Sequence, residues 1–317
     1  MKCFSTFFLF IFSSISLSAG TNGTPVHFNW GSEFNGEVGL RAGYSTGRFQ
    51  YNLFSPIADG SQYLSTLTWS AQEGPASEIF SRLNHNSGFF VKGTLGGISI
   101  GSSTMHDEDS VYAMRGEPYS NTQSTTNNGQ SIYTTIDFGY TFMKSDEWEL
   151  GTFVGYGLYT QRLNAYGCQQ MAGSSVCAGS AQMPQSMLVL SQTEKWNSLR
   201  FGFVGAGNLT EELKLSAEGA WLPYSYFDGV DSHYQNDNRP VAHQFGSSSS
   251  SYQLESTLSY AVTENWKLGA TIRYLSLWAV GEEHLPSISQ PQNYSSTRLT
   301  GLLQISYDFG DPTPARE

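Results

Sequence analysis

Two short polar motifs contain the residue types of hydrolytic chemistry: Asp107-Glu108-Asp109 and Asp231-Ser232-His233. In each motif two acid or base residues stand two positions apart, so on an extended backbone their side chains share a face. Two neighbouring carboxylates repel, which raises the affinity of the pair for one proton or for a water held between them. A carboxylate beside a histidine stabilises its protonated form and fixes the ring. If the motifs face each other, they can hold and deprotonate a water.

Each motif also has a simpler interpretation. Acidic residues in loops are usually only solvated, and a charged cluster is often structural. The Asp107-Glu108-Asp109 motif could alternatively bind Ca²⁺, because carboxylates together with loop carbonyls suit a hard cation. The glycine expected at a turn position of such a loop is missing, which makes this interpretation the weaker one.

The N-terminal segment has the pattern of an export signal. Lys2 supplies the positive charge, an apolar core spans residues 7–12, and small residues follow it. This pattern predicts a signal peptide over residues 1–19 and a single mature domain over residues 20–317. No later stretch approaches the ~18–20 consecutive apolar residues of a spanning helix.

Composition narrows the class of protein. Aromatic residues make up 14% of the chain, with 33 glycines and 18 tyrosines, and no hydrophobic block accompanies them. This combination fits membrane strands that are apolar on one face only. The net charge of −11 disfavours nucleic acid as a partner, because phosphate binding needs a basic surface.

Several segments alternate between apolar and polar residues with a period of two. In the last of them Leu299, Leu303, Ile305 and Tyr307 share one face, and the segment ends on the aromatic Phe309. Short polar turns are expected near residues 84–87, 144–146, 209–211 and 263–265. Long polar stretches lie between them, at residues 54–60, 106–130, 166–192, 229–250 and 281–293.

Short turns on one side and long loops on the other are typical of outer-membrane barrels. The sequence therefore predicts an all-β fold, a transmembrane antiparallel β-barrel of about ten strands with long extracellular loops and periplasmic termini. A soluble β-sandwich behind a signal peptide is the alternative, and the loop asymmetry argues against it.

Two cysteines, Cys168 and Cys177, remain after removal of the signal peptide, in a stretch rich in small polar residues. In an oxidising compartment two thiols nine positions apart most simply form a loop disulfide. The spacing lacks the further ligands that a zinc site requires.

At these residues the chain resembles the omptin family of outer-membrane proteases, from about Gly47 to Phe309. In that family the first motif reads Met-x-Asp-x-Asp and the second Asp-x-His-Tyr, and all four acid or base positions are kept here. The residues that carry the resemblance are Leu67-Thr68-Trp69, Ile98-Ser99-Ile100-Gly101, Met105-His106-Asp107-Glu108-Asp109 and Asp231-Ser232-His233-Tyr234.

The resemblance implies an endopeptidase in the outer membrane of a Gram-negative bacterium, a monomer whose active site faces the exterior and acts on peptides or proteins. The catalytic residues would be Asp107, Asp109, Asp231 and His233, facing one another across an extracellular groove with neither metal nor cofactor. His233 would be the general base and Asp231 would orient it, while Asp107 and Asp109 would position the water and the tetrahedral oxyanion.

The substrate pocket departs from the family pattern. The family prefers to cleave beside basic residues because acidic groups lie on its pocket floor. At two matched floor positions this chain has Tyr51 and Gly229, with Asp228 adjacent, and Met105 matches a residue of the pocket wall. We therefore expect a weaker preference for basic residues and more tolerance of apolar or aromatic ones.

The resemblance also implies lipopolysaccharide as an activator, bound by basic and aromatic residues on the outer wall of the barrel. Tyr156 matches the family there, but Thr160 stands where an arginine is expected and Arg162 follows two positions later.

A function of a different class is a non-enzymatic barrel, either an adhesin or a porin. A porin usually needs about 16 or more strands to leave an aqueous channel, so about ten strands disfavour it. An adhesin stays open, because its acidic loops could bind partners without catalysis.

Overall fold

The computed structural model describes residues 33–54, 63–110, 120–173, 182–234, 241–285 and 288–310. Among these residues no helix is long and apolar enough to cross a membrane. The predicted signal peptide, residues 1–19, lies outside the described residues. The strand segments are β1 (Phe34–Phe54), β2 (Tyr63–His85), β3 (Phe89–Ile100), β4 (Ser102–Asp109), β5 (Ser120–Thr126), β6 (Gly129–Lys144), β7 (Trp148–Gly173), β8 (Gln182–Asn208), β9 (Leu213–His233), β10 (Val241–Ser248), β11 (Ser251–Ala261), β12 (Trp266–Leu285) and β13 (Ile288–Phe309).

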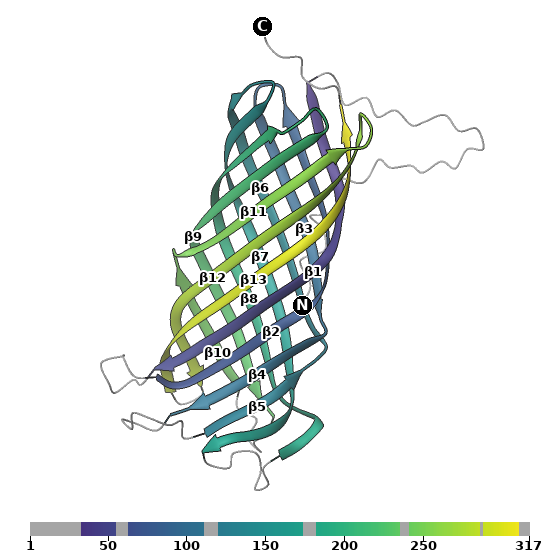
Figure 1. Cartoon of the computed structure of the whole chain (residues 1–317). Helices are drawn as coiled ribbons and strands as arrows, with labels where there is room; N and C mark the ends of the chain where they lie inside the picture. Colours follow the sequence, from purple (N-terminus) through teal and green to yellow (C-terminus); the bar gives the residue numbers. More distant parts are fainter. Residues whose placement is uncertain are drawn as a thin grey trace, which may run out of the picture. The chain divides into compact units, whose positions relative to one another are not determined.

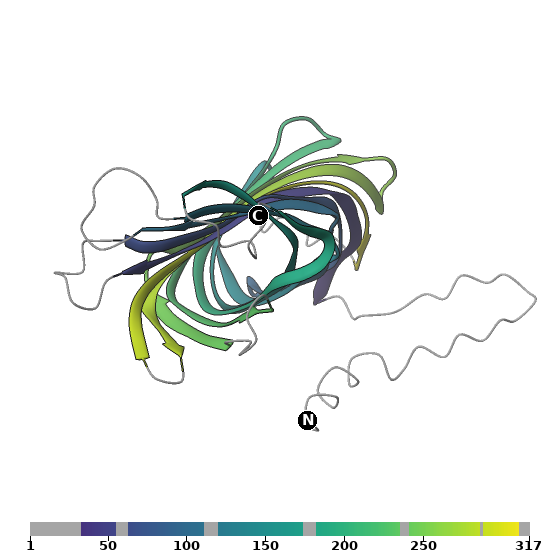
Figure 2. The same ribbon diagram turned by 90° about the horizontal axis from the view of Figure 1, so that it is seen from below.

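The strands form one closed antiparallel ring (Figures 1 and 2), because β1 pairs with β2 on one side and with β13 on the other. Three long strands are each divided into two segments. The segments β3 and β4 both pair with β2, β5 and β6 both pair with β7, and β10 and β11 both pair with β9 and β12. Counting each divided strand once reduces thirteen segments to ten strands, which confirms the predicted barrel.

One register shift decides which side chains enter the barrel. The ladder between β2 and β4 shifts between Ser70 and Glu73, where Ala71 has a φ of 50°. On the loop side of this bulge the buried residues are odd-numbered, Leu67 and Trp69, whereas beyond it they are even-numbered, as at Glu78. Because a one-residue slip moves every side chain to the other face, the bulge lets both halves of β2 present the correct face inward.

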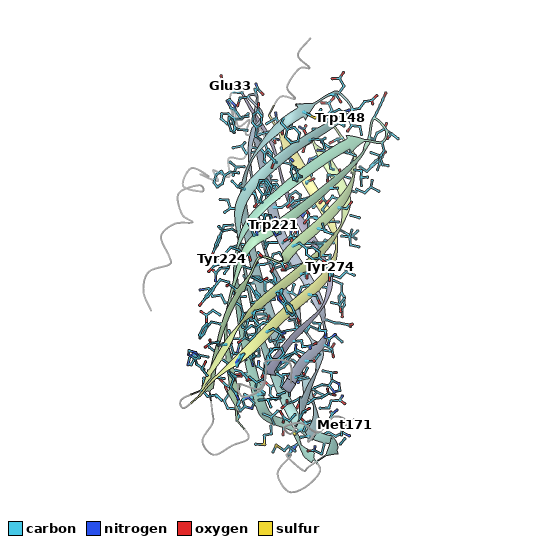
Figure 3. The ribbon with its side chains drawn as sticks, turned by 90° about the vertical axis from the view of Figure 1, so that its left-hand side faces the viewer. Glu33, Trp148, Met171, Trp221, Tyr224 and Tyr274 are labelled. Atoms are coloured by element: carbon cyan, nitrogen blue, oxygen red, sulfur yellow. The ribbon has the colours of Figure 1, made fainter. Side chains whose placement is uncertain are left out.

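An apolar band surrounds the turn-side half of the barrel. Outward residues there are large and exposed, among them Leu40, Phe138 and Leu303. Figure 3 shows Trp148 near the turn end, with Trp221, Tyr224 and Tyr274 near mid-height. Aromatic residues at both borders of an apolar band are typical of transmembrane barrels. The band marks the membrane, and the strands continue well beyond it.

Four short turns, at residues 86–88, 145–147, 209–212 and 262–265, join strands at the membrane-side end, as predicted. At the other end the strands run further than expected. Much of the polar stretches 106–130, 166–192 and 229–250 belongs to strands β4–β5, β7–β8 and β9–β10. Outside the membrane a strand needs no apolar outer face, so the alternation that reveals a strand in sequence is missing there.

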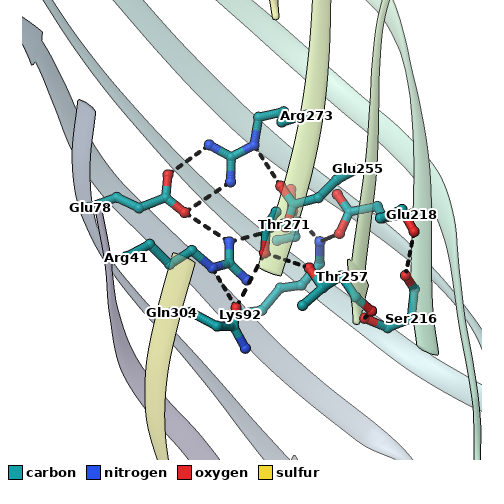
Figure 4. A network of polar contacts seen from close by, with 12 residues as sticks. Arg41, Glu78, Lys92, Ser216, Glu218, Glu255, Thr257, Thr271, Arg273 and Gln304 are labelled. Atoms are coloured by element: carbon teal, nitrogen blue, oxygen red, sulfur yellow. Dashed lines mark hydrogen bonds and ion pairs between the residues drawn. The ribbon is translucent and has the colours of Figure 1, made fainter. Parts of the chain in front are cut away.

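The interior of the membrane-spanning part is lined by charges. Arg41 and Arg273 both bind Glu78 and Glu255, at 2.5 to 3.1 Å (Figure 4). A second group joins Lys92 and Arg200 to Asp137 and Glu218. A cavity of about 750 Å³ runs from the turn end past this network and ends at Trp196, Leu222 and Leu277.

An aromatic layer separates that cavity from the loop-side end. Phe227 packs between Tyr294 and Trp196, with ring centroids 4.2 and 4.7 Å away. Phe49 lies 6.0 Å from Phe227 and continues the layer to Tyr51. The polar motifs lie on the loop side of these buried rings.

Candidate active site

The two polar motifs lie at the loop-side ends of their strands. Asp107 and Asp109 end β4, and Asp231 and His233 end β9. Both strands continue the inward alternation set deeper in the barrel, where Met105 and Phe227 are buried. The predicted same-face geometry of each motif is therefore present in the structure.

Asp231 is the most enclosed residue of the site, with no exposed surface. Its Oδ2 lies 3.2 Å from Nε2 of His233, whose side chain is 34% exposed. The same Oδ2 accepts a hydrogen bond of 2.5 Å from the hydroxyl of Tyr51. Its Oδ1 has no hydrogen-bond partner among the described residues. One carboxylate oxygen thus joins a histidine and a tyrosine.

The Asp107 and Asp109 pair resists full ionisation. Burial, together with the charge of Asp109, raises the pKa of Asp107 to about 7, and a 3.4 Å hydrogen bond from Ser65 opposes the rise. Burial also raises the pKa of Asp109. Near neutral pH the two carboxylates therefore tend to share one proton.

The two motifs act on each other electrostatically. Burial lowers the pKa of His233, but the negative charges of Asp231, Asp107 and Glu283 outweigh it and raise the pKa to about 9. In return, the positive charge of His233 lowers the pKa of Asp107 and of Asp109. Such mutual effects require the β4 and β9 motifs to lie close to each other inside the barrel mouth.

The predicted pocket residues take different places. Tyr51 and Met105 are buried in the cluster beneath the site, whereas Asp228 is exposed between inward-facing Phe227 and Gly229. A Cβ atom at Gly229 would lie 2.6 Å from the Phe227 ring. The position matched to an acidic pocket floor is thus filled by an aromatic ring, and Asp228 points away from it.

A further carboxylate, Glu283 on β12, lies in this region, and the sequence pattern did not predict it as a site residue. It is buried, and it shares a row with Gln244 and Gly229 across β12, β10 and β9. Burial and the charge of Asp231 raise its pKa to about 7, and Gln292 donates to it at 2.8 Å. Glu283 fell in a stretch expected to be loop, so its inward alternation was not recognised.

Buried polar atoms without partners surround this row. Within the described ranges, they are Oε1 of Gln192, Nε2 of Gln244 and Oε1 of Gln292. Buried amides normally have hydrogen-bond partners. The described residues contain no group of three or more acidic, histidine or cysteine side chains arranged to hold a metal.

A model of the Omptin family matches residues 37–279, a range that includes both motifs. The chain belongs to the omptin family. Among solved structures it is similar to the outer membrane protease OmpT of Escherichia coli, at 15% sequence identity and a TM-score of 0.72. That match covers 87% of this chain and 97% of OmpT. At this identity the likeness to OmpT concerns the fold.

Other membrane barrels match more weakly. Ail of Yersinia pestis, in complex with a heparin analogue, matches at 12% identity over 86% of this chain and 99% of its own, with a TM-score of 0.31. OprG of Pseudomonas aeruginosa matches at 11% identity over 87% and 97%, with a TM-score of 0.34. No curated protein matches the sequence of this chain. The family and the barrel place this omptin in the outer membrane of a Gram-negative bacterium.

Proposed function

We propose that this omptin is an outer-membrane endopeptidase that hydrolyses peptide bonds with a water activated by His233. The observation that carries the proposal is the pair of inward motifs whose charges act on each other at the barrel mouth. The unpaired polar atoms beneath them support a site that receives a polar ligand such as a peptide backbone.

In the proposed reaction each acid or base group has a separate role. His233 takes a proton from water, whose oxygen attacks the carbonyl carbon of the substrate, and Asp231 stabilises the imidazolium. The proton shared by Asp107 and Asp109 is donated to the developing oxyanion. When the tetrahedral intermediate collapses, one of its hydroxyl groups returns a proton to the aspartate pair, the C–N bond breaks, and His233 gives its proton to the leaving amine. Nε2 of His233 faces Asp231, so Nδ1 is the nitrogen that meets the water.

The filled interior argues against the porin alternative. Two charge networks line the cavity, and the aromatic layer of Phe227, Tyr294 and Trp196 closes the bore between the cavity and the mouth. A ten-stranded barrel is narrower than porins of about 16–18 strands, which leave an open aqueous channel. The adhesin alternative predicts binding without hydrolysis, so the peptide-hydrolysis test described next distinguishes it from the protease.

The test is hydrolysis of a mixed peptide library by purified protein reconstituted with lipopolysaccharide. His233→Ala and Asp107→Asn should each lower kcat by about 10²–10⁴, because each removes a proton-transfer group. The exposed residues His243 and Asp228 offer matched controls, and His243→Ala and Asp228→Asn should retain activity. EDTA should have no effect. Full activity in the first two variants, or its loss with EDTA, would refute the mechanism.

Activation by lipopolysaccharide is a separate proposal. Tyr156, Thr160 and Arg162 lie on the outward face of β7, and Arg162 and Tyr156 are exposed. Arg162 could take the role of the basic residue missing at Thr160, since guanidinium groups bind phosphate well. Arg162→Ala should raise the lipopolysaccharide concentration needed for half-maximal activity. An unchanged requirement would exclude this role.

A further inference from the structure

Tyr51 occupies a position that sequence comparison assigns to the pocket floor, yet its hydroxyl reaches a different group. It is 5% exposed and donates to Oδ2 of Asp231 at 2.5 Å. Its strand, β1, is separated from β9 by β13, β12 and β10 in the ring. The hydrogen bond therefore crosses the barrel interior and joins two distant parts of the wall.

The hydrogen bond has the geometry of a strong one. A hydroxyl that donates to a carboxylate typically does so at 2.5–2.7 Å, and such charge-assisted bonds are stronger than neutral ones. Asp231 has no exposed surface, and its Oδ1 is without a partner in the described part of the chain. Tyr51 and His233 therefore supply the two polar contacts seen at this buried carboxylate.

We propose that Tyr51 is a positioning residue of the proposed reaction: its hydroxyl orients Asp231 and shares the oxygen that binds His233. The inference rests on the proposed function. The ring of Tyr51 is held edge-on against Phe49, with centroids 6.2 Å apart, so the aromatic layer fixes the hydroxyl. The arrangement makes a Tyr–Asp–His relay of hydrogen bonds in place of an isolated pair.

The shared oxygen limits how strongly Asp231 binds the protonated histidine. A donor on a carboxylate disperses its negative charge and weakens it as an acceptor for a second donor. Without the hydroxyl, Asp231 would attract the His233 proton more strongly, and less neutral histidine would remain to accept a proton from water. The other charges that face the pair are Asp107 and Asp109 on β4 and Glu283 on β12, and a change at Tyr51 leaves all three in place.

The decisive variant is Tyr51→Phe, which removes the hydroxyl and keeps the ring. The matched control is Tyr294→Phe, at the register partner of Tyr51 on β13, because its buried hydroxyl donates to the main-chain oxygen of Glu282. In Tyr51→Phe we expect the pKa of His233, followed by NMR titration of its ring in detergent-solubilised protein, to rise by about one unit. We expect kcat at pH 8 to fall about tenfold with little change in KM, because the neutral fraction of His233 falls in proportion.

The two readouts separate this inference from the proposed function. The NMR titration needs no hydrolysis, with the His233 signal assigned by its loss in His233→Gln. A His233 pKa unchanged in Tyr51→Phe, or shifted equally in Tyr294→Phe, would overturn the positioning role even if the protein is a protease. A shifted pKa in a protein that hydrolyses no peptide would retain the relay and reject the protease.

Discussion

Asp107 and His233 titrate in an order that gives the proposed reaction a defined pH dependence. The reactive form has a neutral His233 and a proton on the Asp107 and Asp109 pair. With pKa values of about 7 for Asp107 and about 9 for His233, that form is a minority at every pH and is most abundant between the two values. Below about 7 it declines because the aspartate pair is already protonated while the neutral fraction of His233 keeps falling, and above about 9 because His233 is already neutral while the protonated fraction of the aspartate pair keeps falling.

We therefore expect kcat/KM to follow a bell-shaped curve with a maximum near pH 8, measured with a neutral peptide over pH 5–11. Asp109→Asn removes one carboxylate and with it the repulsion that raises the pKa of Asp107, so the limb near 7 should move to lower pH. A rate that rises steadily with pH, with no decline above 9, would contradict a proton donated by the aspartate pair.

Substrate specificity also depends on single residues, here those at the pocket floor. The floor positions hold Tyr51, engaged with Asp231, and Gly229, crowded by Phe227. We expect peptides with Met or Phe at the cleavage site to be cut within about tenfold of those with Arg, since neither matched floor position holds a carboxylate to pair with a buried cation. Cleavage-site mapping on a diverse peptide set measures this ratio.

The outward Asp228 provides the control for that measurement. Asp228→Ala should leave the ratio unchanged because the side chain is exposed and its two neighbours face inward. Cuts confined to basic sites, or a basic preference lost in Asp228→Ala, would show that the pocket assignment is wrong.

The strands can be predicted from sequence where they cross the membrane, and less well beyond it. The alternation from Leu299 to Phe309 exists because lipid contacts one face of β13, and the structure exposes Leu299, Leu303 and Ile305 on that face. The spacing of Asp231 and His233 sufficed to place them together on one face of a strand. Glu283 was not predicted as an inward-facing residue, because the strand segments beyond the membrane contact water on their outer face and lack that alternation. The contact between Tyr51 and Asp231 joins residues 180 apart, which no local pattern encodes.

Cys168 lies near the loop-side end of β7, is buried and is disulfide-bonded. Its predicted partner, Cys177, lies outside the described residues. If the pair is bonded in the exported protein, it closes a short loop at the end of a long strand hairpin and limits fraying. We expect no labelling of the untreated, denatured protein by a maleimide and labelling of both cysteines after reduction. Labelling before reduction would disprove the pairing.

For the whole molecule, the buried charge network is a major structural element within the membrane-spanning part. Arg273 binds Glu78 and Glu255 inside the bore, and Arg273→Met would leave two buried carboxylates with Arg41 alone. Breaking a buried ion pair typically costs about 3–5 kcal/mol. We expect this variant to unfold at a lower temperature in the heat-modifiability gel assay, while Lys214→Met, at a more exposed pair with Glu149, should behave as the unchanged protein. Equal unfolding temperatures for both variants would show that the network contributes little.

The aromatic layer beneath the site also affects whether the site exchanges protons with the extracellular medium or with the periplasm. Phe227, Tyr294 and Trp196 lie between the proposed catalytic groups and the cavity that opens at the turn end. Protons lost or gained by His233 and the aspartate pair exchange most directly through the mouth, because the path to the cavity runs through the buried side chains of Glu194, Gln161 and Arg298. The proposed protease would follow the acidity of the medium outside the cell more closely than that of the periplasm. Acidification of the surroundings to pH 5 would leave less neutral His233 and lower the activity, and neutralisation would restore it.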